Sequence, residues 1–215
     1  MNKSVYSLVL TDDVVAEVDR MAYELNTSRS NMINQVLAEY VSYVTPEKRM
    51  RQVFDRIENL LVSGDMFQML LQPSDSMFSL RSALSYKYNP TIRYSVELYR
   101  DMSPLVGELR VSVRSQNSVL HLTMLQFFKL WTKIEQSYVG HTEYAVEDGR
   151  YTRRFRAREG VKEDYSALGE AIAGYIRLFD RAINTYFENL TNPSYAVMAV
   201  ERLYAEYVRT NEMIP

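Results

Sequence analysis

Apolar side chains at the start of the chain follow a strand pattern and then two helix patterns. Residues 4–10 alternate as in a strand whose two faces both carry apolar groups. Apolar residues then recur at helical spacing over residues 12–25 and again over residues 29–44. One strand followed by two amphipathic helices is therefore predicted for the first 45 residues.

Four further helices and two strand pairs are predicted in the rest of the chain. The helices are expected at about 46–64, 117–136, 164–190 and 193–207. The strands are expected to pair as 92–98 with 109–114 and, around an Asp148-Gly149 turn, as 143–147 with 150–156. Residues 66–71 and 77–88 are apolar without a clear period, so they stay unassigned.

The N-terminal segment resembles the ribbon-helix-helix family, the class of the Arc, MetJ and CopG repressors. The resemblance rests on the order of the elements, on Thr11-Asp12-Asp13-Val14, and on the stretch from Asn26 to Ile33. It implies that two chains pair their first strands into an antiparallel ribbon, and that the resulting homodimer binds DNA. A lone strand with two short helices also cannot build a stable monomeric core, which favours a partner chain.

The same resemblance assigns roles to individual residues. The strand positions that would face the core are Tyr6, Leu8 and Leu10. Those that would face the DNA bases are Val5, Ser7 and Val9, of which Ser7 alone carries a hydrogen-bonding side chain. The residues that would contact phosphate are Lys3, Thr27, Ser28, Arg29 and Ser30. An alternative is that the ribbon only dimerises the protein, since capping a helix is a sufficient role for Thr27 and Ser28.

Together these patterns predict the fold class α+β, with an N-terminal ribbon-helix-helix unit and a larger C-terminal region of antiparallel β-hairpins and helices. We expect a ribbon-helix-helix domain over residues 1–45 and a connecting helix over 46–64. A mixed α/β region with a basic hairpin is expected over 65–160, and a helical pair over 161–215. Within the helix of 117–136, Trp131 is expected in the core.

The distribution of charge indicates a second candidate surface, because the basic residues are concentrated in the middle of the chain. The formal net charge is −2, but residues 65–160 hold 13 basic and 10 acidic side chains. In the predicted hairpin, Arg150, Thr152, Arg154 and Arg156 fall on one face and Tyr151, Arg153 and Phe155 on the other. A second nucleic-acid surface at Arg150, Arg154 and Arg156 is one interpretation, and an ordinary exposed hairpin is the other.

Composition removes several classes of function. The chain has no cysteine and two histidines, His121 and His141, whose spacing matches no metal motif. It has no nucleotide-binding glycine loop and no nucleophile motif, so we expect neither an enzyme nor a metal or other cofactor. The apolar runs are too short for a membrane span and no signal peptide is visible, so the protein is expected to be cytoplasmic with no membrane partner.

The sequence thus predicts a homodimeric DNA-binding protein, a transcriptional regulator whose C-terminal region senses a signal or assembles further. A nucleic-acid-binding accessory protein is the first alternative, with the ribbon for dimerisation and the central basic β-region for RNA or single-stranded DNA. It rests on a looser resemblance in element order to bacterial proteins that join a ribbon-helix-helix unit to a WYL-type β-barrel, including CRISPR accessories. The second alternative is a structural oligomerisation module or a toxin-neutralising partner.

Overall fold

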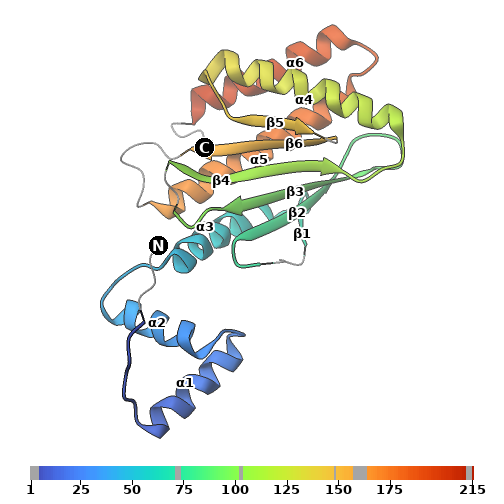
Figure 1. Cartoon of the computed structure of the whole chain (residues 1–215). Helices are drawn as coiled ribbons and strands as arrows, with labels where there is room; N and C mark the ends of the chain where they lie inside the picture. Colours follow the sequence, from blue (N-terminus) through green and yellow to red (C-terminus); the bar gives the residue numbers. More distant parts are fainter. Residues whose placement is uncertain (1–4, 71–73, 102–103, 148, 157–163, 212–214) are drawn as a thin grey trace. The chain divides into compact units, whose positions relative to one another are not determined.

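The chain folds into two compact units, Met1–Arg49 and Met50–Pro215 (Figure 1). The computed structural model describes residues 5–70, 74–101, 104–147, 149–156, 164–211 and 215. Helix α3, Pro46–Leu61, begins in the first unit and continues in the second. The two units are described separately below.

Helices α1, Asp12–Glu24, and α2, Arg29–Tyr40, make up most of the N-terminal unit. Asp12 and Asp13 lie in the first turn of α1, where carboxylates favour the exposed backbone amides. Ser28 caps α2, because its side-chain oxygen accepts a hydrogen bond from the backbone N–H of Asn31 at 3.3 Å. The two predicted N-terminal helices are confirmed.

The predicted strand before these helices is wrong. Residues 5–11 form neither strand nor helix, so the described part of the chain begins with three helices, α1, α2 and α3, before the first strand. The class α+β holds for the whole molecule, but the ribbon-helix-helix unit does not. A strand exists only with a neighbouring backbone to bond, and residues 5–10 form no backbone hydrogen bond with any other described residue.

The C-terminal unit is built on one six-stranded sheet. Its strands are β1, Gln68–Met69; β2, Met77–Ala83; β3, Thr91–Leu98; β4, Leu105–Val113; β5, Tyr144–Glu147; and β6, Arg150–Arg156. They pair antiparallel throughout, in the order β1-β2-β3-β4-β6-β5. Both predicted strand pairs are confirmed. The sequence did not show that β4 also pairs with β6, which joins the pairs into one sheet.

The hairpin of β5 and β6 turns where it was expected. Gly149 adopts φ +71°, a left-handed conformation that glycine reaches without steric cost. Asp148, the other expected turn residue, lies outside the described residues. The register places Glu147 opposite Arg150, so two residues connect the strands.

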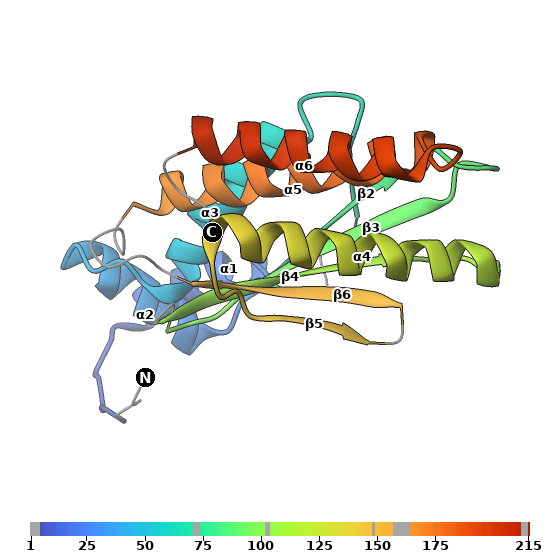
Figure 2. The ribbon, with the colours of Figure 1, turned by 90° about the horizontal axis from the view of Figure 1, so that it is seen from above.

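Helices α4, Ser118–Val139, α5, Tyr165–Glu188, and α6, Pro193–Thr210, cover one face of this sheet (Figure 2). Part of α3 packs on the same face, where Phe54 stacks on Phe78 of β2 at a centroid distance of 5.7 Å. Gly169 lets α5 approach α3, since a Cβ atom there would lie 2.7 Å from Cβ of Arg56. The core lies between sheet and helices, and Trp131 is fully buried in it, as predicted.

The core also contains a buried ion pair between α4 and β6. Nε of Arg153 lies 2.7 Å from Oε1 of Glu135, and the two side chains are 4% and 0% exposed. The hydroxyls of Tyr151 and Tyr175 donate to the other carboxylate oxygen, at 3.3 and 3.2 Å. Burial raises the pKa of Glu135, with Arg153 opposing that shift. Charge and hydrogen-bonding groups of this ion pair are thus matched inside the core.

We expect Arg153→Met to lower the free energy of unfolding by about 3–5 kcal/mol, because it leaves the Glu135 carboxylate buried without its cation. Adding Glu135→Gln should recover part of this loss, since the neutral amide oxygen still accepts from both tyrosines. Urea unfolding of the two single variants and the double variant measures the effect. A double variant that loses the sum of the single losses would contradict a coupled pair.

Candidate nucleic-acid interface

The segment predicted to read DNA bases is extended and uncovered. Val5 and Val9 are fully exposed, and Ser7 between them is also exposed. The side chains expected to face a core, Tyr6, Leu8 and Leu10, are 82%, 60% and 39% exposed. The face expected toward the core is thus less exposed than the other face, but it is not buried in the single chain.

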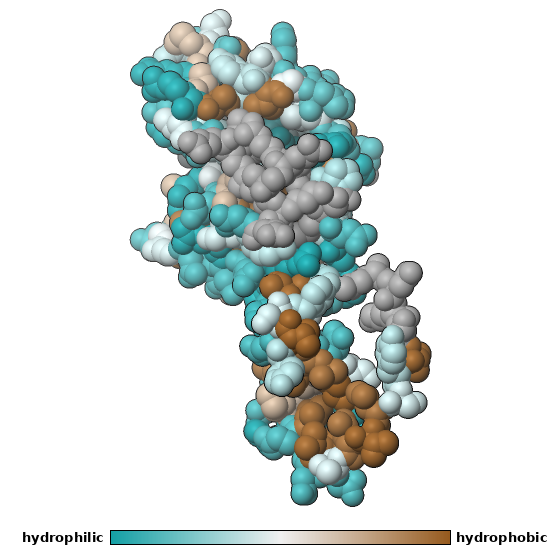
Figure 3. All heavy atoms as spheres, turned by 90° about the vertical axis from the view of Figure 1, so that its left-hand side faces the viewer, coloured by the Kyte–Doolittle hydropathy of each residue, from teal (hydrophilic) through white to brown (hydrophobic). Residues whose placement is uncertain are grey.

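Helices α1 and α2 also leave most of their apolar side chains exposed. Their buried residues are Ala22, Met32 and Ala38. Large apolar side chains remain on the surface of the unit: Val14, Tyr23, Leu25, Val36, Leu37, Tyr40, Val41 and Tyr43. Figure 3 shows a brown, apolar area on this unit, in the lower part of the view. So large an apolar patch marks an interaction surface.

The start of α2 carries the predicted phosphate contacts. Ser28 and Ser30 are exposed there, and Oγ1 of Thr27 accepts a hydrogen bond from Nδ2 of Asn31 at 2.7 Å. Arg29 turns to Asp19 of α1, with 2.6 Å between its Nε and Oδ1, and this contact lowers the pKa of Asp19. Three of the predicted residues thus meet at one helix end, while the arginine is in an ion pair. Lys3 lies outside the described residues.

The net charge of the N-terminal unit does not by itself favour binding to a polyanion such as DNA. Residues 1–49 hold five basic and seven acidic side chains, a formal net charge of 5 − 7 = −2. Binding to phosphate is driven largely by positive charge and counterion release. The net charge of this unit therefore provides no general attraction for a duplex.

The arginines of the hairpin do share one exposed face of β6, as predicted. Arg156 pairs with Glu143 at 2.5 Å, and Arg154 lies 3.5 Å from the same carboxylate. Hydrogen bonds from Arg156 and Arg154 lower the pKa of Glu143, so this acid stays ionised beside them. Arg150 is exposed and forms no ion pair with any described residue. Arg154 and Arg156 thus share one acidic partner, whereas Arg150 has no such partner among the described residues.

The sheet instead groups Arg150 with two arginines that the sequence analysis missed. Strand register places Arg81 of β2, Arg93 of β3, Ser112 of β4 and Arg150 of β6 side by side. We call these four residues the arginine row. Arg81 belongs to the segment left unassigned, although Phe78, Leu80 and Ser82 alternate with Ser79, Arg81 and Ala83 there. That alternation was the available signal.

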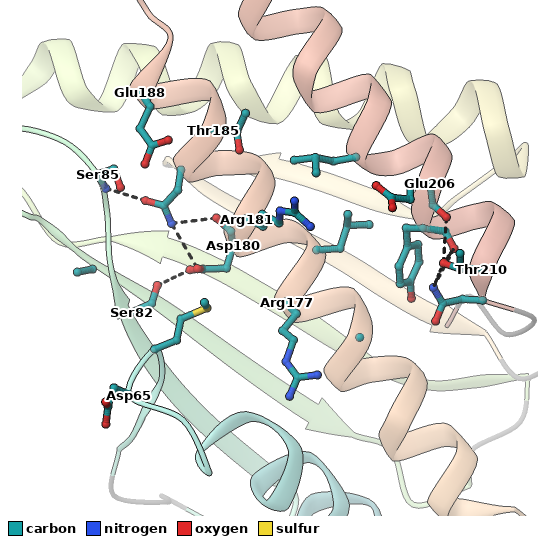
Figure 4. A pocket seen from close by; sticks show the side chains of 18 residues that line it. Asp65, Ser82, Ser85, Arg177, Asp180, Arg181, Thr185, Glu188, Glu206 and Thr210 are labelled. Atoms are coloured by element: carbon teal, nitrogen blue, oxygen red, sulfur yellow. Dashed lines mark hydrogen bonds between the residues drawn. The ribbon is translucent and has the colours of Figure 1, made fainter.

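A cleft of about 850 Å³ opens on the helical side of the C-terminal unit, between α5, α6 and the end of β2 (Figure 4). Arg177 and Arg181 line it from α5 and Glu206 from α6. The guanidinium of Arg177 donates to the backbone oxygen of Leu60, at the end of α3. Basic and acidic side chains are mixed around this cleft, so its charge selects no class of ligand.

Asp180 is the buried carboxylate of this cleft, and its contacts are structural. The hydroxyls of Ser82 and Tyr94 donate to Oδ1 at 2.5 and 2.8 Å, and Nδ2 of Asn184 lies 3.3 Å from Oδ2. Burial raises the pKa of Asp180, while these three hydrogen bonds act in the opposite direction. The carboxylate joins α5 to β2 and β3, and both of its oxygens are already bonded.

Neither a metal site nor a membrane span is found in the described part of the chain. No described group of three or more His, Asp or Glu side chains could hold a metal ion. Among the described helices, none combines the length and apolar character needed to cross a membrane. No family model, curated protein or solved structure matches the chain. The resemblance of the N-terminal segment therefore rests on its sequence alone.

We expect Asp180→Asn to change how stability depends on pH. An acid with a raised pKa in the folded state binds its proton more tightly there, so its contribution to stability falls as pH rises from about 4 through the raised value. The asparagine that replaces it does not titrate. The free energy of unfolding of Asp180→Asn relative to the original protein should therefore increase with pH, in urea unfolding from about pH 4 to 8. Parallel curves for the two proteins would contradict this.

Proposed function

We propose that the protein is a homodimeric DNA-binding protein that assembles through its N-terminal unit. The uncovered apolar surface of this unit carries the proposal. A unit of this size with three buried apolar residues in α1 and α2 has too small a core to be stable alone. A second copy presents the same apolar surface and the same extended segment, so both can be covered at once.

The extended segment supports the same partner. Its backbone N–H and C=O groups form no backbone hydrogen bond with other described residues, so they are available to a partner chain. The start of α2 is the proposed duplex contact, since exposed hydroxyls and backbone amides meet there at the positive end of a helix. Contacts of this kind hold phosphate and do not read base sequence.

In this proposal the protein regulates transcription, and the C-terminal unit senses a signal or assembles further. It has no catalytic role, and it acts in the cytoplasm. The regulatory role rests on the sequence resemblance, whereas dimerisation also has the exposed apolar surface in its favour.

We expect light scattering at micromolar concentration to give twice the chain mass of 25.1 kDa. Leu37→Asp should shift the protein toward the monomer, because it places a charge in the apolar surface of α2, where Leu37 is 52% exposed. Asn34→Asp is the matched control, since it adds the same charge at an exposed polar position of the same helix. A monomeric original protein would contradict the proposal.

We expect the combined change Ser28→Ala, Arg29→Ala and Ser30→Ala to weaken duplex DNA binding equally for all sequences, because phosphates carry no base information. The salt slope of binding should fall by about one counterion, from the loss of Arg29. Ser28→Ala alone controls for the helix cap, which contributes about 1 kcal/mol to stability. Unchanged affinity in a folded triple variant would remove the duplex contact from α2.

A further inference from the structure

The face of the six-stranded sheet opposite the helices is open to solvent. In β3, Ile92, Tyr94, Val96 and Leu98 point into the core and are buried. The residues between them point away from the helices, and on that side Arg81, Arg93 and Arg150 are exposed. The layer of α4, α5 and α6 lies on the other side (Figure 2). The open face is therefore accessible to a partner.

The arginine row lies across this open face without matching acids. Arg81 and Arg93 stand directly opposite each other on neighbouring strands, an arrangement that destabilises a sheet through like-charge repulsion. Their side-chain hydrogen bonds go to neutral groups: Arg81 donates to Gln68 at 3.0 Å, and Arg93 lies 3.5 Å from the hydroxyl of Ser79. Neither they nor Arg150 forms an ion pair with a described residue. An anionic partner would remove this repulsion.

Most acidic residues of the open face pair with arginines that lie outside the arginine row. Glu97 and Glu108 both pair with Arg110, and Glu143 pairs with Arg154 and Arg156. The carboxylate closest in register is Glu147 of β5, opposite Arg150 at one end of the row. Positive charge thus remains concentrated at Arg81 and Arg93, and it extends across β4 to Arg150.

The neighbouring row of side chains contains hydroxyl groups and no rings, and the hydroxyl of Ser79 in it is buried and bonded to that of Ser95. It consists of Ser79, Ser95, Arg110 and Thr152. Guanidinium and hydroxyl groups together are the usual donors to phosphate oxygens. Neither row contains an aromatic residue on which a base could stack, so the chemistry fits a nucleic-acid backbone and not its bases.

We infer that the open face of the sheet binds the phosphate backbone of a single-stranded nucleic acid through Arg81, Arg93 and Arg150. From β2 to β6 the row spans three strand spacings, about 14 Å, across the open face. A flexible single strand can turn successive phosphates toward such a surface, whereas the phosphates of a duplex lie on a cylinder and curve away from it. This site is separate from the duplex contact proposed for α2.

The test measures binding of the full chain to a labelled oligothymidine of about 16 nucleotides, across a salt series. In the triple variant Arg81→Gln, Arg93→Gln and Arg150→Gln, three phosphate contacts should be lost. At about 0.7 counterions per single-strand phosphate, the salt slope should fall by about 2, which is about 100-fold in affinity at about 0.1 M salt. Oligoadenosine should behave alike, because backbone contacts are independent of the base.

Two matched variants control for charge and for folding. The triple change Arg181→Gln, Arg202→Gln and Arg209→Gln removes the same charge from exposed positions on α5 and α6, and it should leave affinity unchanged. The triple change R81K, R93K and R150K keeps the charge and should bind within a few fold of the original protein. Circular dichroism checks that all variants are folded.

The remaining outcomes overturn the inference. They are full affinity in the Arg→Gln triple variant, equal losses in the α5 and α6 control, a larger loss of duplex binding than of oligothymidine binding in the Arg→Gln triple variant, or binding to anionic lipid vesicles in place of oligothymidine. The α2 variant separates this inference from the proposed function. It should keep oligothymidine binding, whereas the sheet variant should keep the dimer and the duplex contact of α2.

Discussion

The alternation of side chains along a strand is the constraint on which the C-terminal unit depends. Because all of its helices cover one face of the sheet, each strand residue lies either in the core or on the open surface. The buried aromatic layer, the ion pair of Glu135 and Arg153, and the arginine row all follow from this division. A register shift by one residue would exchange core and surface along an entire strand.

This constraint also explains which parts of the C-terminal unit the sequence could predict. In β6 the alternation of Arg150, Thr152, Arg154 and Arg156 with Tyr151, Arg153 and Phe155 was visible, and both faces are as expected. The burial of Arg153 was not visible, because its carboxylate partner comes from α4, and pairing between distant residues leaves no local pattern. Arg81 was missed because β2 carries serines on both faces, which weakens its alternation.

The N-terminal unit illustrates a different limit. Its helices begin where they were predicted, since caps and helical spacing are local properties of the sequence, although α2 ends at Tyr40 and not near residue 44. The strand over residues 4–10 was predicted from an equally local pattern, but a strand also needs a second backbone. The described chain supplies none, so Tyr6, Leu8 and Leu10 remain exposed. The predicted strand required a second backbone to pair with, and the described residues of the single chain do not provide one.

Apolar exposure and positive charge occur on different parts of the molecule, and this separation bears on function. The N-terminal unit carries the exposed apolar side chains and a net charge of −2, which suits contact with another protein surface better than contact with a polyanion. The arginine row and the row beside it on the open sheet face carry arginines and hydroxyls without stacking rings. A dimer formed through the first surface would hold two copies of the second. Two weak, sequence-independent contacts joined in this way bind one long strand far more tightly than either alone, provided that both can reach it.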